Sequence, residues 1–242
     1  GANAAMFGIV DRLMFRPYAM LKDPESVDRV YIQYQYRERE ITTESFEYTT
    51  YLDLSRWSTA FSDFAAFFTP RTAVGVGDYA RERRTAAVSA SFWSFFDAPP
   101  ALGRYFGPAE DVTPRGADVV VLSWDYWQSG FGGRDVLGET LQVGNATLTI
   151  IGVTPRGFRG LSEDDAPELY WPITTYAGSR TGEDGRNYFV NYHWGWMEMM
   201  VRRSPGVSRE LATADLSAAY VRSWQAHREQ EPEIASVEIA RP

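Results

Sequence analysis

The sequence has 242 residues, of which 44% are hydrophobic and 23% are charged, so it is long enough for two packed lobes. A net charge of −8 argues against binding of nucleic acid or of an anionic membrane surface, since both need a basic patch. Cysteine is absent, which excludes disulfides and thiolate metal sites. The absence of cysteine fits either the cytosol or a bacterial envelope.

The first residues predict a helix over residues 2–15. Proline at position 17 ends it, because proline lacks the N–H that the helix ladder needs. We interpret residues 1–17 as a buried entry helix or as the outer end of a membrane helix, although no run reaches the ~20 apolar residues of a complete span. The prediction rests on apolar residues that cover most of a helical surface: Met6, Phe7, Ile9, Val10, Leu13 and Met14.

Alternating and aromatic patterns define the next eighty residues. Apolar side chains on one face of residues 27–36 predict a strand, and helical spacing predicts a helix within 45–57. An aromatic strand at 64–68 is followed by a hairpin within 70–88, which carries Arg81 to Arg84 near its turn. Residues 89–96 predict a short helix with Ser89 or Ser91 at its N-cap, ended by prolines.

The clearest alternation of element types lies in residues 117–158. A β-branched run at 118–122 predicts a strand that is buried on both faces. Ser123 is placed to cap a short helix, which Gly132-Gly133 ends in the left-handed conformation. Residues 140–151 then alternate with period two around Gly144-Asn145, a pattern typical of a β-hairpin.

The last third of the chain predicts a long helix after Ser208, with Glu210 in its first turn and Pro232 as its end. The elements expected around it are an acidic loop at 161–167, a strand at 169–173, a flexible loop at 177–186, a strand within 187–202 and a final strand at 234–239.

No motif for catalysis or for cofactor binding emerges. The two histidines, His193 and His227, are too far apart to pair by helical spacing, and no Gly-x-Ser-x-Gly elbow is present. Residues 162–165 lack the alternating oxygen ligands of a calcium loop. We therefore assign no catalytic, cofactor-binding or metal residue, while a hydrolase that uses two of the carboxylates stays open.

Taken in order, six stretches of this sequence resemble the extracytoplasmic core domain of MacB-type permeases, the MacB/FtsX superfamily, and in particular its duplicated-permease branch. Together they cover most of the chain. They read GANAAMFGIVDRLMFRPY, VSASFWSFFDAPPALGRYF, VVVLSWDYWQSGFGG, LGETLQVGNATLTIIGVTPRGF, ELYWPI and VRRSPGVSRELATADLSA.

The resemblance implies an α+β fold with two lobes. Residues 18–100 plus 188–242 correspond to a porter-like lobe of β-α-β layers, and 101–187 to an inserted sabre-like lobe. In such proteins the domain follows the first transmembrane helix. It lies on the periplasmic or extracellular side of the bacterial inner membrane.

The resemblance also implies a function and partners. The domain is non-catalytic and transmits ATP-driven motion to a substrate, adaptor or partner protein. The implied partners are a cytoplasmic ATPase, a second permease copy or an internally duplicated half, and a periplasmic adaptor. No Walker A loop is present, so ATP hydrolysis has to come from another chain.

Two alternative functions are compatible with the same sequence. One is a secreted, aromatic-rich module that binds glycans or proteins, and the other is the carboxylate-based hydrolase. For a partner contact we single out loop tips by their charge and expected exposure. The predicted contact residues are Arg81, Arg83, Arg84, Glu163, Asp164 and Asp165.

Overall fold

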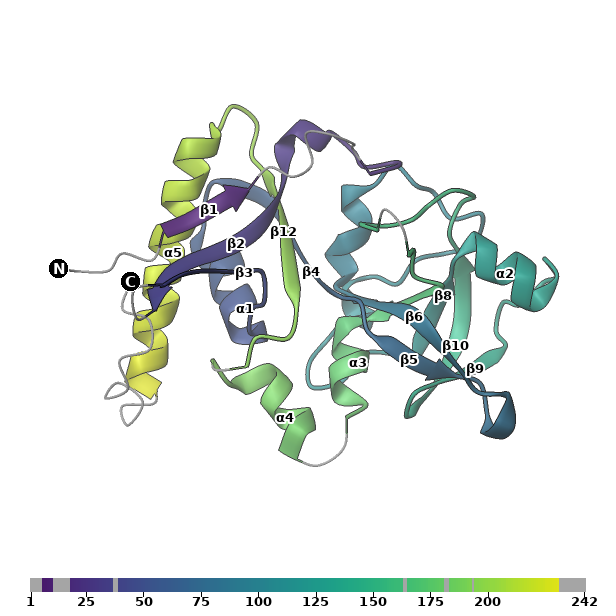
Figure 1. The fold of residues 1–242 in the computed structure, drawn as a ribbon. Coiled ribbons are helices and arrows are strands. Elements are labelled where there is room, and N and C mark those ends of the chain that lie inside the picture. The colour runs from purple at the N-terminus through teal and green to yellow at the C-terminus, as the bar shows by residue number, and fades with distance from the viewer. Residues whose placement is uncertain are drawn as a thin grey trace. The chain divides into compact units, whose positions relative to one another are not determined.

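The computed structural model describes residues 6–10, 18–36, 39–162, 165–180, 183–192 and 194–230 (Figure 1). Contacts divide them into two compact units. The first contains the described residues of Gly1–Met14, Glu25–Phe64 and Val190–Pro242, and the second contains those of Phe15–Pro24 and Ala65–Phe189. Each unit contains both helices and strands, so the predicted α+β class is confirmed.

The first unit combines antiparallel strands with two helices. Strand β2 (Val27–Tyr36) pairs with β1 (Met6–Val10), β3 (Arg39–Thr43) and β12 (Glu198–Arg203). Helix α1 (Tyr48–Trp57) packs against α5 (Arg209–Gln230), the long yellow helix of Figure 1. The core of this unit includes buried side chains from both helices, from β12 and from the isolated bridge between Phe46 and Met197: Phe46, Leu54, Met197, Met199 and Leu216.

The second unit contains six strands in a closed order of pairing, because the last strand pairs with the first. Strands β6, β11, β8, β10, β9 and β5 follow one another, and β5 pairs with β6 again. Pairs β6–β11 and β8–β10 are parallel, and the others are antiparallel. The strands are β5 (Arg71–Val74), β6 (Arg81–Val88), β8 (Val119–Leu122), β9 (Thr140–Val143), β10 (Ala146–Val153) and β11 (Leu169–Pro172).

Shorter elements complete the chain. Strand β4 (Phe61–Phe68) pairs with β6 through Phe67 and Phe68, and β7 (Leu102–Gly103) pairs with β10. The other helices are α2 (Trp124–Phe131), α3 (Ile173–Gly178), α4 (Glu183–Val190) and the 3-10 helices Pro24–Ser26, Gly77–Tyr79, Ala90–Phe95 and Pro108–Glu110. Within the described ranges, every helix is too short or too polar to cross a membrane.

The central stretch folds as its residues predict. Strand β8 follows the β-branched run, and Val120, Val121 and Leu122 are fully buried. The Ser123 hydroxyl caps α2 by accepting a hydrogen bond from the Tyr126 N–H at 3.1 Å. Gly132 ends this helix at a φ of 64°. These local signals are confirmed because capping chemistry and β-branching act within a few residues.

Replacing Ser123 with alanine is expected to lower the free energy of unfolding by about 1 kcal/mol, since the first turn of α2 loses its side-chain cap. Urea unfolding followed by circular dichroism measures the change. Ser129→Ala is the control, because the exposed Ser129 hydroxyl donates only to carbonyls of the same helix. Equal losses in the two variants would contradict a capping role for Ser123.

Several predicted elements are wrong. Met6–Val10 form strand β1 instead of part of a helix, because an apolar run without a polar face suits either structure. The rest of residues 1–17 and the strand predicted at 234–239 lie outside the described residues. The loop predicted at 177–186 contains the end of α3 and the start of α4, and the strand predicted within 187–202 begins only at Glu198.

The helix predicted after Ser89 is a 3-10 helix, and Ser89 does not cap it. The Ser89 hydroxyl instead accepts a hydrogen bond from the Ala66 N–H at 3.0 Å and lies 2.8 Å from the Ser91 hydroxyl. The Ser89 hydroxyl therefore accepts its hydrogen bond from the neighbouring strand β4, whereas the sequence predicts that it caps the helix. Tertiary contacts override the local preference here.

The boundaries of the two units differ from those of the predicted lobes. The predicted inserted lobe spans 101–187, whereas the second unit consists of Ala65–Phe189 together with the described residues of Phe15–Pro24. The difference at the N-terminal boundary has a structural cause. Strand β6 pairs with β11, and β5 pairs with β9, so residues 65–100 belong with the strands that follow them.

Candidate functional site: the fastening of helix α5

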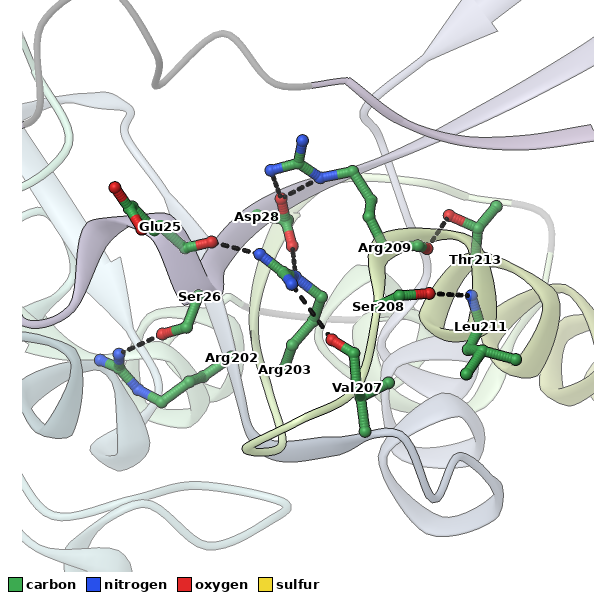
Figure 2. A network of polar contacts seen from close by, with 10 residues as sticks. All are labelled: Glu25, Ser26, Asp28, Arg202, Arg203, Val207, Ser208, Arg209, Leu211 and Thr213. Carbon is green, nitrogen blue, oxygen red and sulfur yellow. Dashed lines mark hydrogen bonds and ion pairs between the residues drawn. The ribbon is translucent and has the colours of Figure 1, made fainter.

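A buried carboxylate holds the N-terminal end of α5 (Figure 2). The Asp28 side chain on β2 is 0% exposed and accepts hydrogen bonds from Arg203 Nε at 2.8 Å and from Arg209 Nε at 3.2 Å. Arg203 ends β12 and Arg209 begins α5, so one carboxylate joins three elements. Beside it, Arg202 donates to the Ser26 hydroxyl at 3.0 Å. Charge-assisted bonds of this kind compensate for the burial of Asp28.

The turn between β12 and α5 is held by the same guanidinium group. Arg203 donates to the Val207 carbonyl at 3.2 Å and also to the Glu25 carbonyl, as Figure 2 shows. The Ser208 hydroxyl accepts a hydrogen bond from the Leu211 N–H at 3.3 Å, which confirms the predicted N-cap. The start of α5 is therefore fixed both by its own cap and by the end of the preceding strand.

A second carboxylate fastens the N-terminal half of α5 to the connection between α1 and β4. Asp215 accepts hydrogen bonds from the Thr59 N–H at 2.9 Å, the Thr59 hydroxyl at 3.0 Å and the Ala60 N–H at 3.1 Å, and also from the Ser58 hydroxyl. Partial burial disfavours the charged form, but these hydrogen bonds outweigh it and lower the pKa of Asp215. The ionised carboxylate therefore bridges two segments far apart in sequence.

A third carboxylate, Asp53 on α1, contacts the C-terminal half of α5. It accepts hydrogen bonds from the Ser223 hydroxyl at 2.8 Å and the Tyr192 hydroxyl at 2.9 Å. Burial, together with the bond to Asp53 and its charge, raises the pKa of Tyr192 to about 12. The Tyr192 ring also stacks on the His227 ring, with centroids 4.9 Å apart. Tyr192 thus joins α1 to the last turns of α5.

These contacts recur along one side of α5. Arg209, Asp215 and Ser223 each bind a different part of the first unit. Next to Ser223, the Arg222 guanidinium lies 4.9 Å from the centre of the Trp57 ring on α1. The stripe of α5 that faces the core consists of buried residues at helical spacing: Ala212, Leu216, Ala219 and Ser223.

The polar groups of this site connect α5 to other elements of the first unit. Asp28, Asp53 and Asp215 each accept at least two hydrogen bonds from protein groups. In the part of the chain that the structure describes, no group of three or more histidine, aspartate or glutamate residues could hold a metal ion. The three carboxylates hold α5 against β2, α1 and the connection that follows α1.

Of the predicted contact residues, the structure brings Arg84 and Asp165 together. The Arg84 guanidinium lies 3.4 Å from the Asp165 carboxylate, which also binds Arg71 at 3.2 Å. Arg71 and Arg84 are direct cross-strand partners, so Asp165 offsets the repulsion between two like charges. Glu163 and Asp164 lie outside the described residues.

The other two predicted arginines, Arg81 and Arg83, bind other groups and do not contact Asp165. Arg83 forms an ion pair with Glu168 and lies 4.4 Å from the centre of the Tyr126 ring. The Arg81 guanidinium donates to the Asp78 carbonyl at 2.8 Å and to the Ala80 carbonyl at 2.9 Å. A role of these residues in binding a partner remains a proposal.

Sequence analysis did not identify the carboxylates that fasten α5. Two signals for them are nonetheless present. Asp28 is a charged residue in a strand of mainly apolar and aromatic residues, and Asp215 interrupts the apolar residues of the last helix. A charge at such a position is expected to have a partner when it is buried.

Solved structures with a similar fold include domains of bacterial permeases and transporters. A domain of a putative permease from Porphyromonas gingivalis is 17% identical, with a TM-score of 0.64 over 90% of this chain and 86% of that chain. The periplasmic region of MacB from Actinobacillus actinomycetemcomitans is 15% identical, with a TM-score of 0.61 over 96% and 99%. The extracellular domain of the noncanonic ABC-type transporter YknZ from Gram-positive bacteria is 13% identical, with a TM-score of 0.53 over 78% and 86%.

The family follows from the sequence itself. The model of the MacB-like periplasmic core domain matches residues 1–219. The chain belongs to this family and is a periplasmic domain of a MacB/FtsX-like ABC-transporter permease, which confirms the predicted resemblance. A search of curated proteins found no match.

Proposed function

We propose that this domain transmits ATP-driven motion of a permease to a substrate, adaptor or partner protein outside the membrane, without catalysing a reaction itself. The observation that carries the proposal is that polar contacts hold α5 at three levels: at its first residue Arg209, at Asp215 and at Ser223. Energy reaches a distant site through elements that move as rigid bodies. A helix bound at several levels to the rest of its unit is such an element.

The length of α5 supports this role. With 22 residues it spans about 33 Å. Arg209, Asp215 and Ser223 distribute its polar contacts over most of that length. A displacement applied to one part of α5 is then shared by β2, by α1 and by the connection that follows α1.

We infer the location and the partners of the domain from its family. The permease lies in the bacterial inner membrane, with this domain on its periplasmic or extracellular side. A cytoplasmic ATPase drives it, and a second permease copy or an internally duplicated half completes it. A periplasmic adaptor is a further partner. The first and second units act as the porter-like and sabre-like lobes.

The test uses the complete permease with its ATPase in lipid nanodiscs. A spin label at Ser55→Cys, an exposed position on α1, is paired with a second label on the membrane part. ATP is expected to change the distance between the labels. The variant Asp215→Asn with Ser223→Ala is expected to lose most of that change while its ATPase activity persists, because α5 is no longer fastened to α1 and to the connection that follows it.

Asp118→Asn is the control for this experiment, because it removes an exposed ion pair to Arg115 in the second unit. It is expected to leave the ATP-dependent distance change intact. The proposal fails if ATP leaves the label distance unchanged in the parent permease. It also fails if the α5 variant keeps the full change although hydrogen exchange confirms that α5 has loosened.

A further inference from the structure

The tip of the β5–β6 hairpin, residues 75–82, presents apolar side chains to solvent. Tyr79 is 86% exposed and Val76 is 72% exposed, the two highest values among the large hydrophobic residues that the structure describes. A single exposed apolar side chain is ordinary, but Val76 and Tyr79 lie in the same turn, where the Tyr79 N–H donates to the Val76 carbonyl. Tyrosine is also among the residues that dominate binding energy at protein interfaces.

Backbone hydrogen bonds give the tip a fixed shape. The Tyr79 N–H donates to the Val76 carbonyl at 3.2 Å, and the Ala80 N–H donates to the Gly77 carbonyl at 3.1 Å. At the base, the Gly75 N–H donates to the Gln142 carbonyl on β9 at 2.9 Å. Gly75 has a φ of 108°, which favours glycine. The backbone that carries Val76 and Tyr79 is thus held in place before any partner binds, which reduces the entropic cost of binding.

The charges of the tip are of both signs and lack partners of opposite charge. Asp78, Arg81 and Glu82 are exposed. Within the described residues, the carboxylates of Asp78 and Glu82 have neither an ion pair nor a hydrogen bond, and Arg81 donates only to backbone carbonyls. The apolar pair is thus flanked by two acids and one base without charged partners, and a surface that also carries both signs of charge can pair with it.

We propose that this tip binds the same tip on a second copy of the chain. In a two-fold contact each residue meets its counterpart reciprocally, so Asp78 of one copy faces Arg81 of the other and the reverse holds as well. Tyr79 and Val76 then bury their apolar surface at the centre. The reciprocal pairs between Asp78 and Arg81 make the patch complementary to itself, whereas a partner of one sign would repel either the acidic residues or the arginine.

The contact is weak in solution and is strengthened by attachment to a membrane. A hairpin tip buries much less than the ~800 Å² per partner of a stable complex. Two copies held in one membrane assembly meet at a high effective concentration, so a weak contact is then populated. The contact does not depend on transport, and its failure would leave the role of α5 untouched.

The absence of cysteine makes the test direct. The Val76→Cys chain carries one thiol at the proposed two-fold contact, and Ser94→Cys carries one at an exposed position elsewhere in the second unit. Under mild oxidation at high protein concentration, Val76→Cys is expected to form disulfide dimers about tenfold faster than Ser94→Cys. Adding Tyr79→Ser is expected to reduce the Val76→Cys rate to that of the control. Equal rates for the two single-cysteine chains, or no effect of Tyr79→Ser, would overturn the proposal.

Charge reversal separates a two-fold contact from unspecific collision. In the Val76→Cys chain, Asp78→Lys and Arg81→Glu are each expected to slow dimer formation, because like charges then face each other. Together they are expected to restore it, since the reversed pair is again complementary. Circular dichroism confirms that each variant is folded. A double variant as slow as the two single variants would overturn the reciprocal pairing.

Discussion

Replacing Asp28 with alanine is expected to lower the free energy of unfolding by about 3 kcal/mol, the cost typical of removing one partner from a buried ion pair. The side chains of Arg203 and Arg209 would lose the carboxylate that both bind, and Arg203 is only 16% exposed. Water can reach Arg209 more easily, because it is 32% exposed, and this limits the loss. Asp28→Asn keeps an acceptor oxygen and is expected to lie between the parent chain and the alanine variant.

The measurement is urea unfolding combined with hydrogen exchange. Circular dichroism gives the change in stability, and exchange identifies the first turns of α5 as the site of loosening. Asp118→Ala is the matched control, since its ion pair with Arg115 lies at the surface and is expected to contribute less than about 1 kcal/mol. If Asp28→Ala cost no more than this control, the carboxylate would not be holding β2, β12 and α5 together.

Local signals in the sequence account for much of the fold. The β-branched run of β8, the cap at Ser123 and the turn at Gly144 each act within a few residues, and all three are confirmed. The strand of residues 27–36 is also confirmed by its alternating pattern, and the helix after Ser208 is confirmed by its N-cap. Such features are predictable because hydrophobic periodicity and capping chemistry belong to one segment.

Long-range pairing explains what the sequence analysis missed. The boundary between the units depends on β6 pairing with β11, whose residues are about eighty positions apart. Arg209 and Asp28 form their ion pair across 181 positions, and Asp215 binds Ala60 across 155. No pattern within a short window specifies such contacts. The sequence predicted that α5 exists, but not what holds it.

The predicted partner-contact residues illustrate a related limit. Charge and expected exposure pointed to arginines near the β5–β6 turn, yet Arg83 and Arg84 are both engaged in ion pairs within the second unit. The most exposed large hydrophobic side chains that the structure describes, Tyr79 and Val76, lie on the same hairpin. A charge pattern predicts that a residue lies near the surface, but the fold decides whether its charge is already used.

Asp215→Asn is expected to lower the free energy of unfolding at pH 7 by about 1.5 kcal/mol, because hydrogen bonds to a charged acceptor become bonds to a neutral one. The effect also depends on pH. Because the folded state lowers the pKa of Asp215, the stabilisation is complete above the unfolded pKa of about 3.9 and is lost as the pH falls through the folded pKa. The difference between the parent chain and the variant is therefore expected to stay constant from pH 7 to 5 and to shrink in more acidic solution.

Asp111 provides a control with the opposite sign. Burial raises its pKa, although the Ala90 N–H and the N–H and hydroxyl groups of Thr174 donate to its carboxylate. Ionisation of Asp111 therefore costs stability above the folded pKa, and acidification relieves that cost. Relative to Asp111→Asn, the parent chain is expected to gain stability as the pH falls, whereas relative to Asp215→Asn it loses stability. Unfolding curves with the same pH dependence for both variants would mean that Asp215 does not fasten α5 through its charge.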